Sequence, residues 1–280
     1  MTRLPRTSSR PLVFAHRGGS ALAPENTMAA FANGLALGAD GLELDVRLSK
    51  DGHAIVLHDP TVDRTTNGEG AVADMLASDI QRLDAGYHYE RDGQRPWRGR
   101  GCHIPLLRDV LTQFPFAPAI VELKTAEPDL VRAAVGELRA ADAVERIIVG
   151  SFHPETLQAV RTLEPRVRTG ADLTEIRRGM SAVPGEPQRV EGVFHSFQVP
   201  EIFRGERVVT PVFVQCAHDA DVQVYVWTVD REDDIRRLLS WGIDGVMTDR
   251  PDVAVRIVAE WWTSAPRSGV ALPSLGTRDG

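Results

Sequence analysis

The chain has 280 residues, of which 42% are hydrophobic and 25% charged, a composition typical of a globular protein with one large α/β domain or two smaller ones. Its formal net charge of −7 argues against nonspecific nucleic-acid binding and against attraction to an anionic membrane surface. Two cysteines make a disulfide framework unlikely to be the basis of the fold, and no apolar run reaches the length of a signal-peptide core or a transmembrane span. We therefore expect a cytoplasmic location.

The first elements of the chain alternate between strand and helix. Residues 12–15 are an apolar run that predicts a short buried strand. Asn26 or Thr27 is expected to cap a helix that ends at Gly38. A second strand follows from Gly41, so this region predicts a βαβ unit with a parallel sheet.

The stretch from Gly41 to Asp59 predicts a strand, a tight turn and a returning strand. Glu43 and Asp45 are two residues apart, so both carboxylates project from the same face of the strand. Asp51-Gly52 is a strong hairpin signal. If it forms a two-residue loop, Asp45 pairs directly with His58, and one hairpin gathers two acids and an imidazole.

From about residue 60 to 104 the periodicity weakens, and we interpret this segment as an insertion with short helices. The alternation then resumes, and eight strands in all are expected to start at residues 12, 41, 119, 146, 167, 192, 222 and 245. Helices between them are expected at 106–114, 129–141, 154–163, 208–217, 232–241 and 252–262, and a short helix followed by a loop at 174–187.

Eight β/α units in about 250 residues predict a (β/α)8 TIM barrel with a small insertion after strand 2. A doubly wound open sheet is the alternative, although the Gly-rich fingerprint of its nucleotide-binding form is absent. We assign residues 1–264 to this single domain and expect 265–280, rich in Pro, Gly and Ser, to be a disordered tail.

Catalytic residues of such barrels lie at the carboxyl ends of the strands and in the loops that follow. The polar residues expected there are His16, Arg17, Glu43, Asp45, His58, Glu122, Lys124, Trp227, Thr228, Thr248 and Asp249. Three carboxylates without a cysteine suit a hard divalent cation such as Mg²⁺ or Ca²⁺. The alternative is that the three acids only form buried ion pairs with Arg17 and Lys124.

Two histidines beside these acids favour catalysis over a structural role, whereas the other six histidines have no such neighbours. One imidazole can act as base and the other as acid in the cleavage of a phosphodiester. Arginine binds phosphate in a bidentate fashion and lysine binds it as a point charge. The residues alone therefore indicate metal-assisted phosphoester chemistry.

Short motifs in a fixed order extend this interpretation. They are Ala15-His16-Arg17-Gly18, Pro24-Glu25-Asn26-Thr27, Glu43-Leu44-Asp45-Val46, Lys50-Asp51-Gly52, Leu57-His58-Asp59, Asp63-Arg64-Thr65-Thr66-Asn67-Gly68, Ile104-Pro105, Glu122-Leu123-Lys124, Ser151-Phe152, Trp227-Thr228-Val229, Gly242-Ile243-Asp244-Gly245 and Thr248-Asp249. In this order the chain resembles the glycerophosphodiester phosphodiesterases from Ala15 to about Pro251. Asp230 departs from the pattern, since Asn is common there, and the sixth-strand region matches poorly.

The resemblance implies hydrolysis of a glycerophosphodiester, a small-molecule substrate, to sn-glycerol 3-phosphate and an alcohol. It implies that Glu43, Asp45 and Glu122 hold one divalent cation, and that His16 and His58 are the acid/base pair. By motif, the resemblance also implies that Arg17 and Lys124 bind the phosphate and that Trp227 forms a wall on the glycerol side. It implies that Glu25 orients neighbouring side chains. In the mechanism implied, a glycerol hydroxyl attacks phosphorus and water then opens a cyclic phosphate.

Two other functions are kept open. A lysophospholipase D-type phosphodiesterase would need an apolar groove, for which Tyr87, Tyr89 and Trp97 of the insertion are the only indication. A non-catalytic phosphodiester-binding protein would be favoured by the loss of a histidine or a metal acid, and all are present. The choice between Mg²⁺ and Ca²⁺, the alcohol and the oligomeric state are not specified by the sequence.

Overall fold

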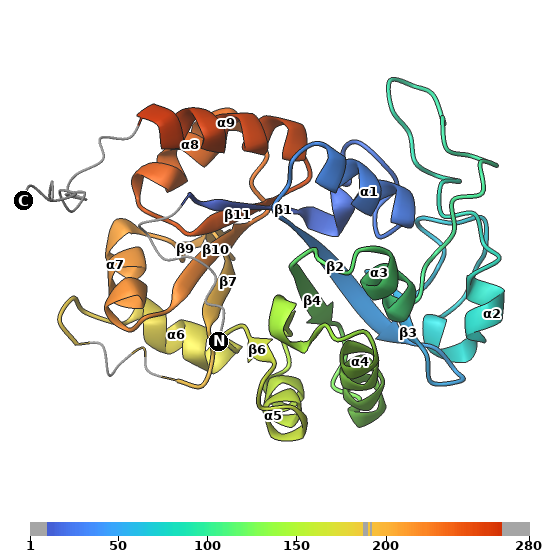
Figure 1. Ribbon diagram of the computed structural model, residues 1–280, viewed down its shortest axis with the longest axis horizontal. Helices are drawn as coiled ribbons and strands as arrows, with labels where there is room; N and C mark the ends of the chain where they lie inside the picture. Colours follow the sequence, from blue (N-terminus) through green and yellow to red (C-terminus); the bar gives the residue numbers. More distant parts are fainter. Residues whose placement is uncertain (1–9, 187–189, 191, 265–280) are drawn as a thin grey trace, which may run out of the picture.

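The computed structural model describes residues 10–264 except 187–189 and 191, so the tail expected at 265–280 lies outside the described residues. Within them, parallel strands surround a central axis and helices cover the outside (Figure 1). The barrel strands are β1 (Leu12–Ala15), β2 (Gly41–Leu48), β4 (Ala119–Leu123), β5 (Ile147–Gly150), β6 (Arg168–Thr169), β7 (Ser196–Pro200), β10 (Gln223–Trp227) and β11 (Gly245–Thr248).

Neighbouring strands follow the order β6-β5-β4-β2-β1-β11-β10-β7. An isolated parallel bridge between Gly170 and Ser196 brings the two ends of this order together. The eight described strands therefore form a nearly closed barrel, which confirms the predicted fold class. The seam between β6 and β7 is its most weakly paired junction, because β6 has only two residues.

The outer layer agrees closely with the predicted helices. The helices are α1 (Met28–Ala36), α3 (Leu107–Gln113), α4 (Pro128–Ala140), α5 (Pro154–Leu163), α6 (Leu173–Met180), α7 (Pro211–Asp219), α8 (Glu232–Ser240) and α9 (Pro251–Ser264). Thr27 caps α1 by accepting a hydrogen bond from the Ala30 N–H, and Gly38 follows its end with a φ of 96°.

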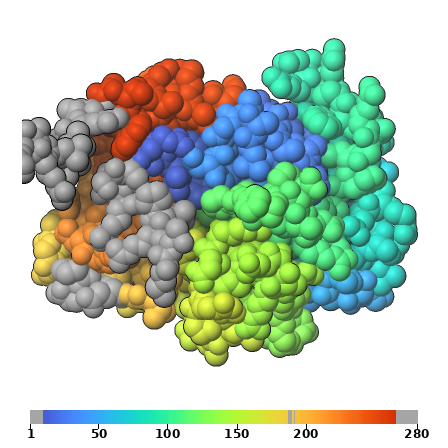
Figure 2. All heavy atoms as spheres, viewed as in Figure 1, coloured from blue at the N-terminus to red at the C-terminus, as the bar shows by residue number. Residues whose placement is uncertain are grey.

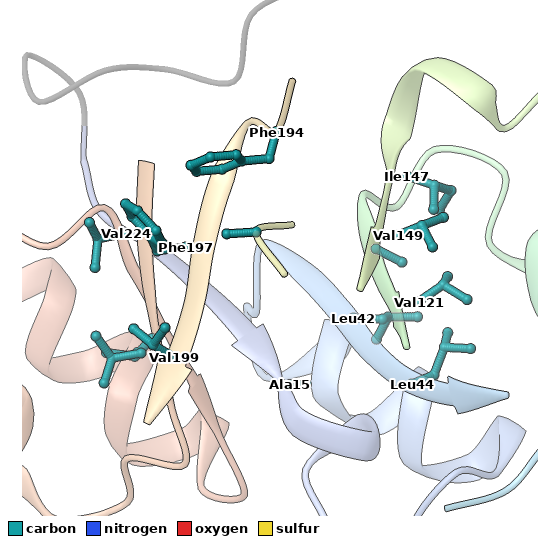
Figure 3. Close-up of a cluster of buried hydrophobic side chains, with 14 of the residues drawn as sticks. Ala15, Leu42, Leu44, Val121, Ile147, Val149, Phe194, Phe197, Val199 and Val224 are labelled. Atoms are coloured by element: carbon teal, nitrogen blue, oxygen red, sulfur yellow. The ribbon is translucent and has the colours of Figure 1, made fainter. Parts of the chain in front are cut away.

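The strand side chains alternate between two layers, as the period of two requires. Alternate residues such as Leu42, Leu44, Val121, Ile147 and Val149 belong to the large core between strands and helices, and they lie close together in Figure 3. The residues between them face the barrel interior, where a second cluster contains Phe14, Ile120, Ile148, Tyr225 and Met247. Glu43, Asp45 and Glu122 occupy interior positions of this alternation, which directs their carboxylates into the barrel.

The hairpin register predicted around Asp51-Gly52 is wrong by one residue. β2 pairs with β3 (Ala54–Val56) so that Val46 lies opposite Val56, and the Leu57 N–H donates to the Asp45 carbonyl at 3.0 Å. The loop has three residues, because Gly52 adopts a φ of 83° and its N–H returns to the Ser49 carbonyl. His58 still lines the pocket, because the chain has left the β ladder beyond Val56.

Two of the later strands were also placed incorrectly. The strand expected from residue 167 is reduced to the two residues of β6, and α6 begins at Leu173 with Asp172 as its cap. The strand expected from 192 begins at Ser196 instead. An Asp followed three residues later by Glu175 forms a capping box, and this local signal overrides the weak apolar run.

The segment between β3 and α3 has a small core of its own. It carries the short helices η2 (Val72–Asp74) and α2 (Ala77–Ile80), as expected for the insertion after strand 2. Its core contains Leu57, Val62, Val72, Ile80 and Ile104. The segment stands out at the right of the space-filling view (Figure 2).

The remaining elements are short. η1 (His16–Gly18) follows β1, η3 (Val144–Arg146) precedes β5, and β8 (Ile202–Phe203) pairs with β9 (Glu206–Arg207) as a small hairpin after β7. Both cysteines are buried and free. Across the described part of the chain, no helix combines the length and the apolar character that a bilayer span requires.

Candidate active site

A pocket of about 150 Å³ opens at the carboxyl ends of the barrel strands. The residues that were given a role in the predicted site all line it except Glu25, which touches a lining residue instead. Thr228, Thr248 and Asp249 were expected at the same end of the barrel and do not line it. The lining residues are His16, Arg17, Glu43, Asp45, His58, Ile120, Glu122, Lys124, Gly150, Ser151, Phe152, Ala171, Leu173, Ile176, Gln198, Trp227 and Met247.

Three carboxylates form the most acidic part of the pocket. Glu43 and Asp45 come from β2, and the parallel register places Glu122 of β4 directly beside Asp45. One ligand atom from each of the three lies within 4.8 Å of the others. Glu43 and Asp45 are 4% and 1% exposed, so the three could hold a metal ion away from bulk water.

The negative charge of this cluster is only partly compensated. Burial raises the pKa of Glu43 to about 7, and the charges of Asp45 and Glu122 add to the effect. Within the described residues, Glu43 is held by the Arg17 backbone N–H at 3.0 Å and lies 3.8 Å from His16 Nε2. A hard cation would relieve this crowding, so the residues present fit a divalent metal ion.

Two cations lie beside the acids, as the ion-pair alternative required. Lys124 Nζ lies 2.9 Å from Glu122 and 3.3 Å from Asp45. Arg17 Nε lies 3.2 Å from Asp45, and this Nε makes no hydrogen bond of good geometry. Although burial opposes ionisation, Lys124 and Arg17 keep the pKa of Asp45 below its usual value. Ion pairs with Arg17 and Lys124 therefore account for Asp45 and Glu122. Among the side chains that the structure describes, Glu43 has only the more distant His16 Nε2, at 3.8 Å, as an ion-pair partner.

Each histidine of the pocket is held by a carboxylate at Nδ1. His16 Nδ1 lies 2.6 Å from Asp249 Oδ1, and His58 Nδ1 lies 2.7 Å from Asp59 Oδ1. A carboxylate at Nδ1 favours the tautomer with its proton there, which leaves Nε2 for the pocket. Burial alone would lower the pKa of His16, but Glu43 and Asp249 outweigh it and raise the pKa.

Arg64 connects the two sides of this polar wall. It donates to Asp59 at 2.5 Å and 3.2 Å, and to both oxygens of Glu25 at 2.8 Å and 2.7 Å. Glu25 also accepts from Arg17 at 3.0 Å. Hydrogen bonds therefore run from His58 through Asp59, Arg64 and Glu25 to Arg17.

The loop that carries His16 and Arg17 is pressed against α1. Arg17 and Gly18 have φ values of 51° and 86°, and a Cβ on Gly18 would lie 2.6 Å from the Ala30 Cβ. Glycine is required there because the backbone turns left-handed where no side chain fits. Asn26, also at positive φ, donates to Asp45 Oδ2 at 2.9 Å and fixes the same loop to β2.

The opposite wall of the pocket is mostly apolar. Phe152 and Trp227 meet edge to face, with ring centroids 6.0 Å apart. Leu173 and Ile176 of α6 continue this wall, and Gln198 of β7 reaches across the barrel close to Gly150. A Cβ on Gly150 would lie 2.6 Å from Gln198 Oε1, so glycine makes room for this side chain.

The sequence interpretation left several residues without a role. Asp249 was expected at the rim but not as the partner of His16, and Asp59 and Arg64 were noted only within motifs. The position of Asp59 directly after His58 was a signal for the second dyad. Nothing local could reveal the first, because His16 and Asp249 lie 233 residues apart.

A parallel barrel that collects acids, imidazoles and cations around one pocket at its carboxyl ends defines this chain as an enzyme of the (β/α)8 class. Comparison with protein families makes the assignment specific. The model of the glycerophosphoryl diester phosphodiesterase family matches residues 16–253. The chain belongs to this family.

Individual relatives agree with the family assignment. The chain is 34% identical over 258 residues to a glycerophosphodiester phosphodiesterase of Caldanaerobacter subterraneus, covering 89% of this chain and 98% of the relative. The crystal structure of glycerophosphodiester phosphodiesterase from Agrobacterium tumefaciens superposes with a TM-score of 0.72 at 28% identity, covering 88% of this chain and 99% of the other. A phosphodiesterase of Oleispira antarctica, solved with the product sn-glycerol-3-phosphate, gives a TM-score of 0.72 at 27% identity, covering 89% and 97%.

Proposed function

We propose that this chain hydrolyses glycerophosphodiesters to sn-glycerol 3-phosphate and an alcohol. The observation that carries the proposal is the pocket itself, in which three carboxylates, two carboxylate-held histidines and two cations face one another. The family match and the product bound by the Oleispira antarctica relative support the same chemistry. The cytoplasmic location stays a prediction from the sequence.

Glu43, Asp45 and Glu122 would hold one divalent cation, Mg²⁺ or Ca²⁺. When bound, this cation supplies Lewis-acid polarisation of a phosphoryl oxygen and a template for the substrate. The three carboxylates lie on strands β2 and β4, at positions whose side chains point into the barrel. The strands themselves therefore orient these side chains, and no separate metal-binding loop is needed.

His16 and His58 are proposed as the acid/base pair. One Nε2 accepts the proton of the attacking glycerol hydroxyl, and the other protonates the oxygen of the departing alcohol. Water then opens the cyclic phosphate formed in this step and gives sn-glycerol 3-phosphate. Asp249 and Asp59 fix the imidazole orientations at Nδ1. Arg17 and Lys124 bind the phosphate oxygens, and Trp227 forms a flat apolar wall for the glycerol carbons. Glu25 orients Arg17 and Arg64 through the hydrogen bonds described above.

The direct test is the release of sn-glycerol 3-phosphate from glycerophosphocholine by the purified protein. Activity is expected with added Mg²⁺ or Ca²⁺ and is expected to disappear with EDTA and to return when the cation is restored. Undiminished activity in EDTA would contradict the role given to the three carboxylates. Complete absence of hydrolysis across a panel of glycerophosphodiesters, each with each metal, would contradict the function and favour a non-catalytic phosphodiester-binding protein.

A further inference from the structure

An apolar groove of about 530 Å³ adjoins the pocket on the side away from the acids. Its apolar wall is formed by Phe152, Leu173, Ile176, Met180, Phe203 and Val208. Phe152, Met180 and Phe203 are 41%, 38% and 44% exposed, so three large apolar side chains meet water around one depression. Its charged members, Arg177, Arg204 and Glu206, are all exposed.

The groove is continuous with the pocket rather than a separate surface feature. Phe152, Leu173, Ile176 and Gln198 line both of them. A ligand held at the phosphate-binding cations can therefore extend past Gln198 into the groove. The insertion aromatics that suggested an apolar site in the sequence lie elsewhere, because Tyr89 and Trp97 line a different depression.

The far wall of the groove is anchored by charge rather than by apolar packing. Phe203 lies on β8, whose hairpin begins next to Glu201. Glu201 accepts hydrogen bonds from Arg237 of α8 at 2.6 Å and 3.0 Å, and it also pairs with Arg207 of β9. These contacts hold the hairpin to α8. They leave Phe203 partly exposed, with the Arg204 guanidinium over its ring at 5.3 Å from the centroid.

Given the proposed function, we infer that the groove binds an apolar chain carried by the alcohol part of the substrate. The glycerol hydroxyls suit the wall of acids and histidines, with the glycerol carbons against Trp227. An alkyl or acyl chain suits the part of the apolar wall from Phe152 to Phe203, which lines the groove and does not include Trp227. In an in-line displacement the departing alcohol oxygen lies opposite the attacking glycerol hydroxyl, so glycerol in the polar half places the alcohol beside the groove. The preferred substrate class is a glycerophosphodiester of a long-chain alcohol.

The test compares three substrates under the same conditions, below their micelle concentrations: glycerophosphocholine, glycerophospho-octanol and a lysophosphatidylcholine. In each reaction the ester P–O bond to the alcohol breaks, and water supplies the hydroxyl gained by phosphorus and the proton gained by the alcohol oxygen. We expect kcat/KM for the octyl ester to exceed that for glycerophosphocholine by about ten-fold or more, since each buried methylene adds to binding.

Two neighbouring residues of one strand provide matched variants. Phe203→Glu places a charge in the groove and should remove most of the octyl preference, lowering the ratio of the two kcat/KM values by about ten-fold. Ile202→Glu is the control, because Ile202 is 52% exposed on the same strand but does not line the groove. It should leave the ratio unchanged. Since both side chains are exposed, neither variant should fail to fold.

The possible outcomes of these experiments either support the inference or overturn it. Hydrolysis of glycerophosphocholine without an octyl preference would overturn the groove assignment and leave the proposed function intact. A preference for the lysophosphatidylcholine would also overturn it, because its chain is attached to glycerol and not to the alcohol. An equal loss in Phe203→Glu and Ile202→Glu would overturn it as well. Failure to cleave any of the three substrates would overturn both the inference and the function.

Discussion

The two halves of the pocket are built by two contiguous halves of the barrel. Strands β4, β2, β1 and β11 contribute the acids, cations and His16, whereas β5, β6, β7 and β10 and the loops after them contribute the apolar wall. The polar side chains are tied to one another by direct hydrogen bonds, such as the one from His16 to Asp249. The apolar half has half-exposed side chains and opens into the groove.

This difference separates two tasks of an enzyme. Chemistry requires groups that are fixed to within a fraction of an ångström before the substrate arrives, and a dense hydrogen-bond network provides this. Selection among alcohols requires a surface of suitable shape and polarity, which apolar side chains provide without fixed partners. Changes in the polar half should therefore affect every substrate alike, and changes in the apolar half should alter preference.

The largest effect is expected for the histidines. His16→Ala or His58→Ala should lower kcat by about 10³-fold for all glycerophosphodiesters, because the proton acceptor or donor is lost. Steady-state rates on two substrates check this, and circular dichroism checks folding. His153→Ala is the matched control, since His153 follows β5 at the same end of the barrel but does not line the pocket. Full activity in either active-site variant would refute the role of that histidine.

The next effect concerns the three carboxylates proposed to bind the cation. Glu43→Gln keeps the shape of the side chain but removes its charge, so cation affinity should fall by about ten-fold or more. A bound ion at about 100 times its Kd stabilises the fold by about 2.7 kcal/mol. A ten-fold weaker affinity leaves about 1.4 kcal/mol at the same ion concentration, so the rise in Tm should be about halved in the variant. Thermal unfolding with EDTA or with Mg²⁺ or Ca²⁺ measures this. Glu155→Gln, at an exposed carboxylate, should behave like the wild type. An equal rise in Tm for Glu43→Gln would refute the site.

A smaller effect is expected where a carboxylate only orients a histidine. Asp249→Asn should lower kcat by about 10- to 100-fold with little change in KM, because an amide can also donate and thus stabilise the wrong tautomer of His16. The ratio of the rates on glycerophosphodiesters of short and long alcohols should not change. This result would show that the polar half of the pocket affects the rate and not the substrate preference. Asp252→Asn, in the same region but paired with Arg250, is the control. A change in substrate preference with unchanged kcat would contradict this interpretation.

The smallest effect concerns stability and pH. Arg64→Met should destabilise the fold by about 1 kcal/mol at pH 7, since the contacts of Arg64 are half-exposed and partly screened. Hydrogen bonding to Arg64 lowers the pKa of Asp59 to about 2. The contact therefore stabilises the fold above about pH 4 and is lost as the pH falls toward 2. Calorimetry should show a Tm difference at pH 7 that shrinks by pH 2.5.

The exposed pair of Arg82 and Asp79 offers a comparison for this prediction. Arg82→Met should change Tm little at either pH, because a single surface ion pair contributes almost nothing. If Arg64→Met also changed Tm little at either pH, the hydrogen bonds that link His58 to Arg17 through Arg64 would not contribute measurably to stability. A Tm difference that grew toward low pH would contradict the sign derived from Asp59.

The sequence predicted the barrel and the polar half because both depend on local patterns. Glu43 and Asp45 are two residues apart on one strand, and Glu122 and Lys124 have the same spacing on the following predicted strand. Side chains two residues apart on a strand point to the same face, so the sequence alone predicts that each pair shares a face. The hairpin register was missed because Gly52 can serve a two- or a three-residue loop, and the motif does not distinguish them. The Asp249 partner was missed because only the closed barrel brings β11 beside β1.

The apolar half could not be predicted in the same way. Phe152, Ile176 and Phe203 belong to three separate segments, and no periodicity links them. Each one alone is consistent with ordinary core or surface positions. Their convergence depends on the shortness of β6 and on how Glu201 anchors the hairpin, and the sequence predicted a longer strand than β6.

The seam between β6 and β7 gives the barrel an uneven resistance to opening. On one side of the molecule β2 and β4 share five residue pairs, whereas β6 shares two pairs with β5 and meets β7 through one isolated bridge. Local unfolding requires the least free energy where the fewest backbone hydrogen bonds must break. Amide hydrogens at the seam should therefore exchange with solvent sooner than those beside the three carboxylates. We therefore expect the barrel to open first beneath the groove, away from the β2–β4 pair that carries the three carboxylates.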